Sequence, residues 1–91
     1  SYAAGSPTTD GERLYASFGS YGTFCYDFEG KQLWSRTDLG LIHSRLGWGE
    51  AVTPVVAGGK VLLNFDEEFD SKLYCLAADT GKTVWTAKRD E

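Results

Sequence analysis

The side chains best able to bind a small molecule lie together in the segment 38–50: His43, Arg45, Trp48 and Glu50. Arg45 can pair with an anion, Trp48 can stack on a flat ligand, and Glu50 can accept hydrogen bonds. His43 is the only histidine, but a general base needs a positioned partner that spacing alone does not supply. The same residues also fit a connector in which Arg45 pairs with Glu50 and Trp48 fills a gap. We favour this second interpretation, because a connector must pack whatever the function.

The acidic segment Asp66-Glu67-Glu68-Phe69-Asp70 is a candidate calcium site, since hard cations take several carboxylate oxygens. It lacks the ligand spacing and the sharp-turn glycine of an EF-hand loop. We therefore interpret it as a solvated hairpin loop whose charges discourage edge-to-edge association. The chain also lacks a glycine-rich phosphate loop, a zinc signature and a nucleophile elbow. The sequence accordingly predicts no catalytic residue and no metal ligand.

The segment 38–50 connects two copies of an internal repeat. Ser6–Leu14 aligns with Thr53–Val61, and Gly30–Trp34 aligns with Gly81–Trp85. The spacing grows from 47 residues at the prolines to 51 at the tryptophans, which indicates small insertions in the loops of the second copy. We expect a first unit at residues 1–40, followed by a connector and a second unit at residues 41–91.

Each copy is predicted to form four short strands and no helix, because turn residues separate apolar runs at the spacing of an all-β repeat. The predicted strands are Tyr2–Thr9, Arg13–Phe18, Thr23–Phe28 and Gln32–Arg36, then Ala51–Val56, Lys60–Phe65, Lys72–Ala77 and Thr83–Ala87. The two cysteines, Cys25 and Cys75, take equivalent places in separate copies, which would hold their backbones too far apart for a disulfide. We expect two free, buried thiols.

Two segments, Val61–Leu63 and Leu73–Ala77, are apolar on both faces instead of alternating. Such strands need cover on both sides, which a radial stack of sheets supplies. The fold class predicted is therefore an all-β propeller with two four-stranded antiparallel blades. Two blades alone leave the apolar outer faces exposed to solvent. We therefore expect either that copies associate into a closed ring or that the chain is a piece of a longer one.

At Gly30-Lys31-Gln32-Leu33-Trp34 and Ala78-Asp79-Thr80-Gly81-Lys82-Thr83-Val84-Trp85 the sequence resembles the pyrroloquinoline-quinone-type (PQQ-type) repeat of quinoprotein β-propellers. In that family an acidic-Thr-Gly turn precedes the outermost strand, whose tryptophan docks between blades against a glycine peptide. The resemblance thus gives structural docking roles to Gly30, Trp34, Gly81 and Trp85. The first copy departs from the pattern, because Asp27-Phe28-Glu29-Gly30 lacks the threonine and is one residue shorter. The departure weakens its turn and leaves its blade assignment intact.

The resemblance also implies where the connector lies and how many chains would close a ring. Connectors in propellers border the central channel, so it places His43, Arg45, Trp48 and Glu50 facing that channel. The superfamily includes quinone-dependent dehydrogenases and an outer-membrane assembly scaffold lipoprotein, and its propellers usually have about seven or eight blades. A ring of four chains, or of three chains for six blades, is the closed assembly expected.

Composition narrows the function classes further. With 13 acidic and 9 basic side chains the net charge is -4, which disfavours nucleic acid as a partner. No apolar run approaches the roughly 20 residues needed to span a bilayer. We expect a structural or interaction module whose partner is itself, without catalytic activity and without a cofactor, PQQ included. The alternatives are a fragment of a PQQ-dependent oxidoreductase and a propeller that binds sugars or peptides. The resemblance also suggests an exported parent protein.

Overall fold

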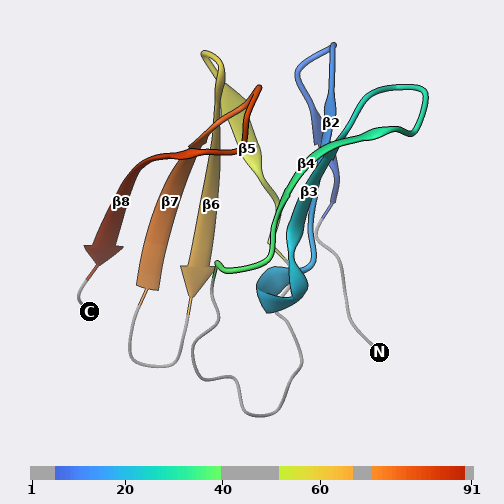
Figure 1. The fold of residues 1–91 in the computed structure, drawn as a ribbon. Helices are drawn as coiled ribbons and strands as arrows, with labels where there is room; N and C mark the ends of the chain where they lie inside the picture. Colours follow the sequence, from blue (N-terminus) through green and yellow to red (C-terminus); the bar gives the residue numbers. More distant parts are fainter. Residues whose placement is uncertain (1–5, 40–51, 67–70, 90–91) are drawn as a thin grey trace.

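The computed structural model describes residues 6–39, 52–66 and 71–89, which form two four-stranded antiparallel sheets (Figure 1). Within each sheet the strands follow one another in sequence order. The first sheet contains β1 (Thr8–Thr9), β2 (Leu14–Ser17), β3 (Thr23–Tyr26) and β4 (Gln32–Arg36), with a short 3-10 turn at Gly19–Tyr21. The second contains β5 (Val55–Ala57), β6 (Lys60–Asp66), β7 (Ser71–Ala77) and β8 (Thr83–Arg89). The predicted all-β architecture with two blades is confirmed.

The first strand of each sheet is shorter than the sequence indicated. Thr8–Thr9 and Val55–Ala57 begin directly after Pro7 and Pro54, because a proline has no N–H to donate to the ladder. The first part of the predicted strand Tyr2–Thr9 lies outside the described residues. The two short strands are joined where the Thr8 hydroxyl donates to the Pro54 carbonyl at 2.7 Å.

The strand register shows that the two sheets are structural copies. Cys25 faces Trp34 across β3 and β4, and Cys75 faces Trp85 across β7 and β8. Both pairs of strands shift register directly after the cysteine, at Cys25/Tyr26 and at Cys75/Leu76. The repeat found in the sequence is therefore a repeat of backbone geometry, down to the place of the bulge.

The hydrophobic core lies between the two sheets. Its buried members from the first sheet and its flanks are Tyr15, Cys25, Trp34, Leu39 and Val52, and those from the second are Val61, Leu63, Phe65, Tyr74, Leu76 and Ala78. One face of each sheet builds this core, and among the described residues no sheet packs on the opposite faces (Figure 1). The described part of the chain thus forms a single inter-sheet interface.

Both cysteines are free and buried, which confirms the prediction for them. Cys25 lies on the face that meets the second sheet, and burial raises the pKa of its thiol to about 11. Among the described residues, no helix has the length and apolar character needed to cross a membrane.

The interface between the sheets as the candidate functional site

Trp34 is the central contact between the two sheets. Its indole leaves β4 and its Nε1–H donates to the Ala78 carbonyl of the second sheet at 2.8 Å. The side chain is 8% exposed. A Cβ at Gly81 would lie 2.5 Å from two atoms of the indole ring, and the φ of Gly81 is +78°. Glycine is therefore required at position 81 both by its backbone conformation and by the ring packed on it.

The turn Ala77–Gly81 presents the carbonyl that Trp34 uses. The Gly81 N–H donates to the Ala77 carbonyl at 2.8 Å, and the Ala77 N–H donates to the Lys82 carbonyl at 2.8 Å. The Ala78 N–H donates to the Gly59 carbonyl at 2.9 Å, so the peptide on one side of Ala78 is tied to its own sheet. The Ala78 carbonyl is the group left to accept a hydrogen bond from the neighbouring sheet.

Arg36 is a second bridge between the sheets, and sequence reasoning missed it. Its Nη1 donates to the Gly81 carbonyl and to the Thr83 hydroxyl, both at 2.9 Å. Its Nε and Nη2 donate to the two carboxylate oxygens of Asp38, each at 2.8 Å. Because Asp38 takes one edge of the guanidinium, the other edge is fixed toward the second sheet. The arrangement Arg-x-Asp just after a docking tryptophan was the available signal.

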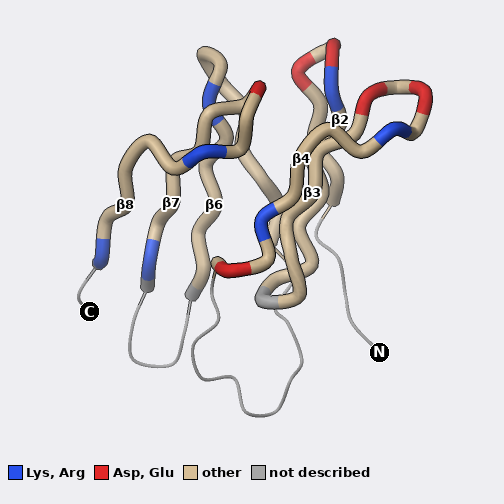
Figure 2. The backbone as a smooth tube through the Cα atoms, in the orientation of Figure 1, with Lys and Arg blue, Asp and Glu red and all other residues tan. Residues whose placement is uncertain are grey.

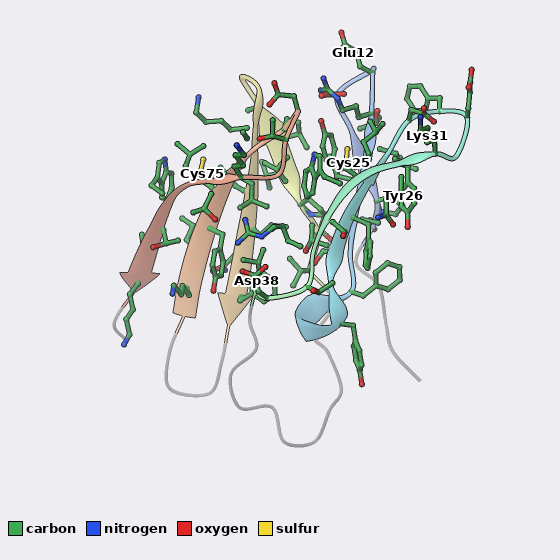
Figure 3. All side chains as sticks on the ribbon, in the orientation of Figure 1. Glu12, Cys25, Tyr26, Lys31, Asp38 and Cys75 are labelled. Atoms are coloured by element: carbon green, nitrogen blue, oxygen red, sulfur yellow. The ribbon has the colours of Figure 1, made fainter. Side chains whose placement is uncertain are left out.

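The two partners of this ion pair stabilise each other's charged form. The hydrogen bond from Arg36 lowers the pKa of Asp38, and the hydrogen bond to Asp38 raises the pKa of Arg36. Asp38 lies at the end of the first sheet, on the side nearer the second (Figure 3). Its position is therefore that of a carboxylate that orients a bridging arginine.

Tyr15 supports Trp34 from within the first sheet. The two ring centroids are 6.3 Å apart, and Tyr15 is fully buried. Its hydroxyl donates to Asp10 Oδ2 at 2.8 Å, while Asp10 Oδ1 accepts the backbone N–H groups of Glu12 and Arg13 at 2.9 and 2.8 Å. One carboxylate thus holds both the β1–β2 turn and the tyrosine beside the indole.

The pKa values of this network follow from burial and hydrogen bonding. Burial raises the pKa of Tyr15 to about 12. For Asp10, burial acts to raise the pKa, but hydrogen bonds from two backbone N–H groups and from Tyr15 outweigh it, so the net shift is downward. The network is therefore held in one protonation state, with a neutral phenol and a charged carboxylate, across the neutral range.

The equivalent residues at the outer faces lack these contacts. Trp85, the counterpart of Trp34, is 42% exposed. Gly30, the counterpart of Gly81, has φ +90°, and a Cβ added to it would meet nothing within 4 Å. Figure 3 shows Cys25 on the side of the first sheet that faces the second, and Tyr26 on the side that faces away. The docking roles expected for Gly30 and Trp85 stay predictions, since their partners would have to come from outside the described residues.

The turns that carry the two glycines differ by one residue. In the first sheet the Gly30 N–H donates to the Asp27 carbonyl at 3.0 Å and the Asp27 N–H donates to the Lys31 carbonyl at 2.9 Å. Asp27 thus takes the place of Ala77, and one residue fewer separates it from the glycine. The shortening seen in the sequence therefore falls within the turn that, in the second sheet, presents a carbonyl to the tryptophan.

The four connector residues proposed to face a channel, His43, Arg45, Trp48 and Glu50, lie outside the described residues, as do Glu67–Asp70 of the acidic segment. The structure therefore does not test these predictions. Within residues 6–39, 52–66 and 71–89, no three or more His, Cys, Asp or Glu side chains come together as a metal site would need.

Comparisons with known proteins support the fold. No protein-family model matches the sequence, and no curated protein matches it either. Among solved structures the chain is similar to a europium-containing methanol dehydrogenase, with a TM-score of 0.76 and 18% sequence identity. The match covers 91% of this chain and 15% of that one. Since the neighbour is a β-propeller, the two sheets correspond to part of a propeller, and the chain spans a small share of the neighbour's length.

Proposed function

We propose that this chain is an interaction module, a two-bladed unit of a β-propeller that associates through its outer faces into a closed ring of three or four copies. The observation that carries the proposal is the contrast between the two tryptophans. Trp34 is packed on Gly81 inside the chain, while Trp85 and Gly30 are exposed on the two outer faces. The chain holds one complete blade-to-blade contact and the two separate halves of another.

The outer faces have the apolar character that such packing needs. On the outer face of the second sheet the exposed side chains Val55 and Trp85 belong to one cross-strand row. On the outer face of the first sheet the partly buried rings of Phe24 and Tyr26 stack on each other. Charged side chains of the described residues gather on turns and near strand ends, which leaves the centres of the sheets uncharged (Figure 2). Exposed apolar surface of this kind marks an interaction site. Because the two outer faces differ, association through them is head-to-tail and closes only as a ring.

Sedimentation equilibrium from micromolar to near-millimolar protein tests this function. The expected result is a mass that rises with concentration and levels off at three or four chains, because a ring has no free face left. A mass that stays at one chain throughout, with a cooperative melting transition, would show that a single pair of blades is complete in itself. A mass that rises without limit would show an open fibre instead of a ring.

No catalytic step and no cofactor are assigned to this module. A second candidate function comes from the similarity to part of a dehydrogenase: the same outer faces would then be covered by further blades of a longer chain, which would also complete a cofactor site. Titration with PQQ and calcium, on this chain and on its associated form, tests whether the blades present can form such a site. We expect no saturable change in absorbance, and saturation at one equivalent per chain or per ring would favour the oxidoreductase.

A further inference from the structure

We infer that Trp85 of one copy packs on Gly30 of the next copy, and that this contact is weaker than the Trp34 contact inside the chain because alanine takes the place of the arginine that bridges the internal contact. The inference rests on the proposed self-association and names the residues that would form its interface. It makes the assembly head-to-tail and dependent on concentration.

The outer face of the second sheet carries the same row of residues that forms the inner face of the first. Val55, Leu62, Cys75 and Trp85 face one another in register across β5, β6, β7 and β8. The corresponding row in the first sheet is Thr8, Tyr15, Cys25 and Trp34. That first row is packed on a sheet already. The second row thus forms another tryptophan-bearing face, which we call the donor face. Trp85 is half-exposed in it.

The outer face of the first sheet corresponds to the face that receives Trp34. In the second sheet the receiving face contains Val61 opposite Leu76 and Leu63 opposite Tyr74. At the equivalent places the first sheet has Leu14 opposite Tyr26 and Ala16 opposite Phe24. The ring of Phe24 stacks on that of Tyr26, with centroids 6.4 Å apart. All of these outer side chains are only partly buried, as expected of a receiving face without its partner.

The polarity of the contact follows from the two kinds of face. A tryptophan-bearing face packs on a glycine-bearing face inside the chain, and each copy exposes one face of each kind. Two donor faces packed together would place indole against indole with no glycine to receive either ring. The contact is therefore heterologous, and each copy has one donor end and one receiving end.

The receiving turn and the bridging arginine both differ between the internal contact and the contact between copies. The Asp27–Gly30 turn is one residue shorter than the Ala77–Gly81 turn, in which the Ala78 carbonyl accepts the indole N–H of Trp34. Ala87 takes the place of Arg36, so no guanidinium reaches the Gly30 carbonyl as Arg36 reaches that of Gly81. The contact between copies consequently depends on apolar packing of Trp85 more than the internal one does.

Two substitutions test the donor and the receiving end separately. Trp85→Ala removes the donor ring, and Gly30→Asn adds a side chain to the receiving end in a residue type that tolerates positive φ. Their matched controls are Val84→Ala, a neighbouring exposed apolar residue, and Gly11→Asn, whose φ of +93° and open surroundings match those of Gly30. We expect each test variant to weaken association about thirtyfold or more and each control less than about threefold.

Mixing the two test variants gives the decisive result. The Gly30→Asn chain keeps a working donor end and the Trp85→Ala chain keeps a working receiving end, so an equimolar mixture should form a 1:1 heterodimer that grows no further. Thermal melting of each variant in dilute solution checks that it folds. If Trp85→Ala melts at a lower temperature than the wild type, Trp85→Gln replaces it.

The outcomes separate this inference from the function on which it rests. If the wild type associates but the test variants associate equally well, or if their mixture forms no heterodimer, the Trp85–Gly30 contact is wrong while self-association stands. If the wild type stays monomeric at every concentration, both are overturned.

Discussion

Trp34 and Trp85 occupy the same place in two sheets of the same construction, yet their exposed fractions are 8% and 42%. Each faces its cysteine across the same pair of strands and directly follows the same bulge. The difference comes from the neighbouring sheet: Trp34 has Gly81 and the Ala78 carbonyl to pack on, while no sheet of residues 6–39, 52–66 and 71–89 lies on the side of Trp85. Within a repeat fold, burial of a docking residue is thus a property of the pair of blades and not of one blade.

The largest expected effect comes from truncating each tryptophan. In dilute protein, Trp34→Ala should lower the free energy of unfolding by about 3 to 5 kcal/mol, because it empties the centre of the interface. Trp85→Ala should lower it by less than about 1 kcal/mol, since the ring is half-exposed there. Urea unfolding followed by circular dichroism measures both. Equal losses would mean that Trp85 already has a partner within the chain.

The glycine pair gives the next largest effect. Gly81→Ala and Gly30→Ala both place a Cβ on a residue with positive φ, at a cost of about 1 kcal/mol each. Only at Gly81 does the new methyl group meet the Trp34 ring, which should add about 1 to 3 kcal/mol of overpacking. Thermal melting of the two variants side by side isolates that difference. Identical melting temperatures would contradict the close approach of the indole to Gly81.

The arginine bridge can be removed from one sheet and added to the other. Arg36→Met keeps most of the apolar stem and should cost about 1 to 2 kcal/mol of unfolding free energy, measured by urea unfolding. Ala87→Arg combined with Arg89→Asp supplies the same oriented pair on the outer face, so it should leave the dilute chain's stability unchanged and tighten association about tenfold by sedimentation. Unchanged association would show that position 87 does not face the next copy.

The smallest effect is a loss of stability at alkaline pH. It originates at Cys25, on the face of the first sheet that meets the second. The pKa of Cys25 is raised by burial from 9.0 to about 11, so the folded chain keeps the thiol protonated after the unfolded chain has lost its proton. Stability should therefore be constant below about pH 9 and fall as the pH rises toward 11. Tyr15, raised to about 12, adds its own loss only above pH 10. Urea unfolding at pH 8 to 10 should show a flatter profile for Cys25→Ala, and an unchanged slope would contradict the assignment.

Much of the fold was predictable from the sequence because the sequence contains two copies of the same repeat. The alignment of Gly30–Trp34 with Gly81–Trp85 gave the blades, the outermost strands and the free cysteines. The first strands were overestimated because Pro7 and Pro54 were placed inside the ladder instead of before it.

The inter-sheet contacts were less accessible to sequence reasoning. The bridge from Arg36 to Gly81 joins residues 45 positions apart, and no local pattern fixes such a distance. The unequal exposure of Trp34 and Trp85 could not be read from the two matching motifs either, since it depends on which neighbour each blade has.

The exposure of the two indole N–H groups tests the central claim most directly. A soluble gadolinium chelate broadens NMR signals of exposed protons, and the indole resonances can be assigned with Trp85→Phe and Trp48→Phe. We predict that the Trp34 signal is shielded at every protein concentration, while the Trp85 signal is broadened in dilute protein and becomes shielded as the mass rises. A Trp85 indole that stays accessible to the chelate at concentrations where the chain has associated would contradict the account.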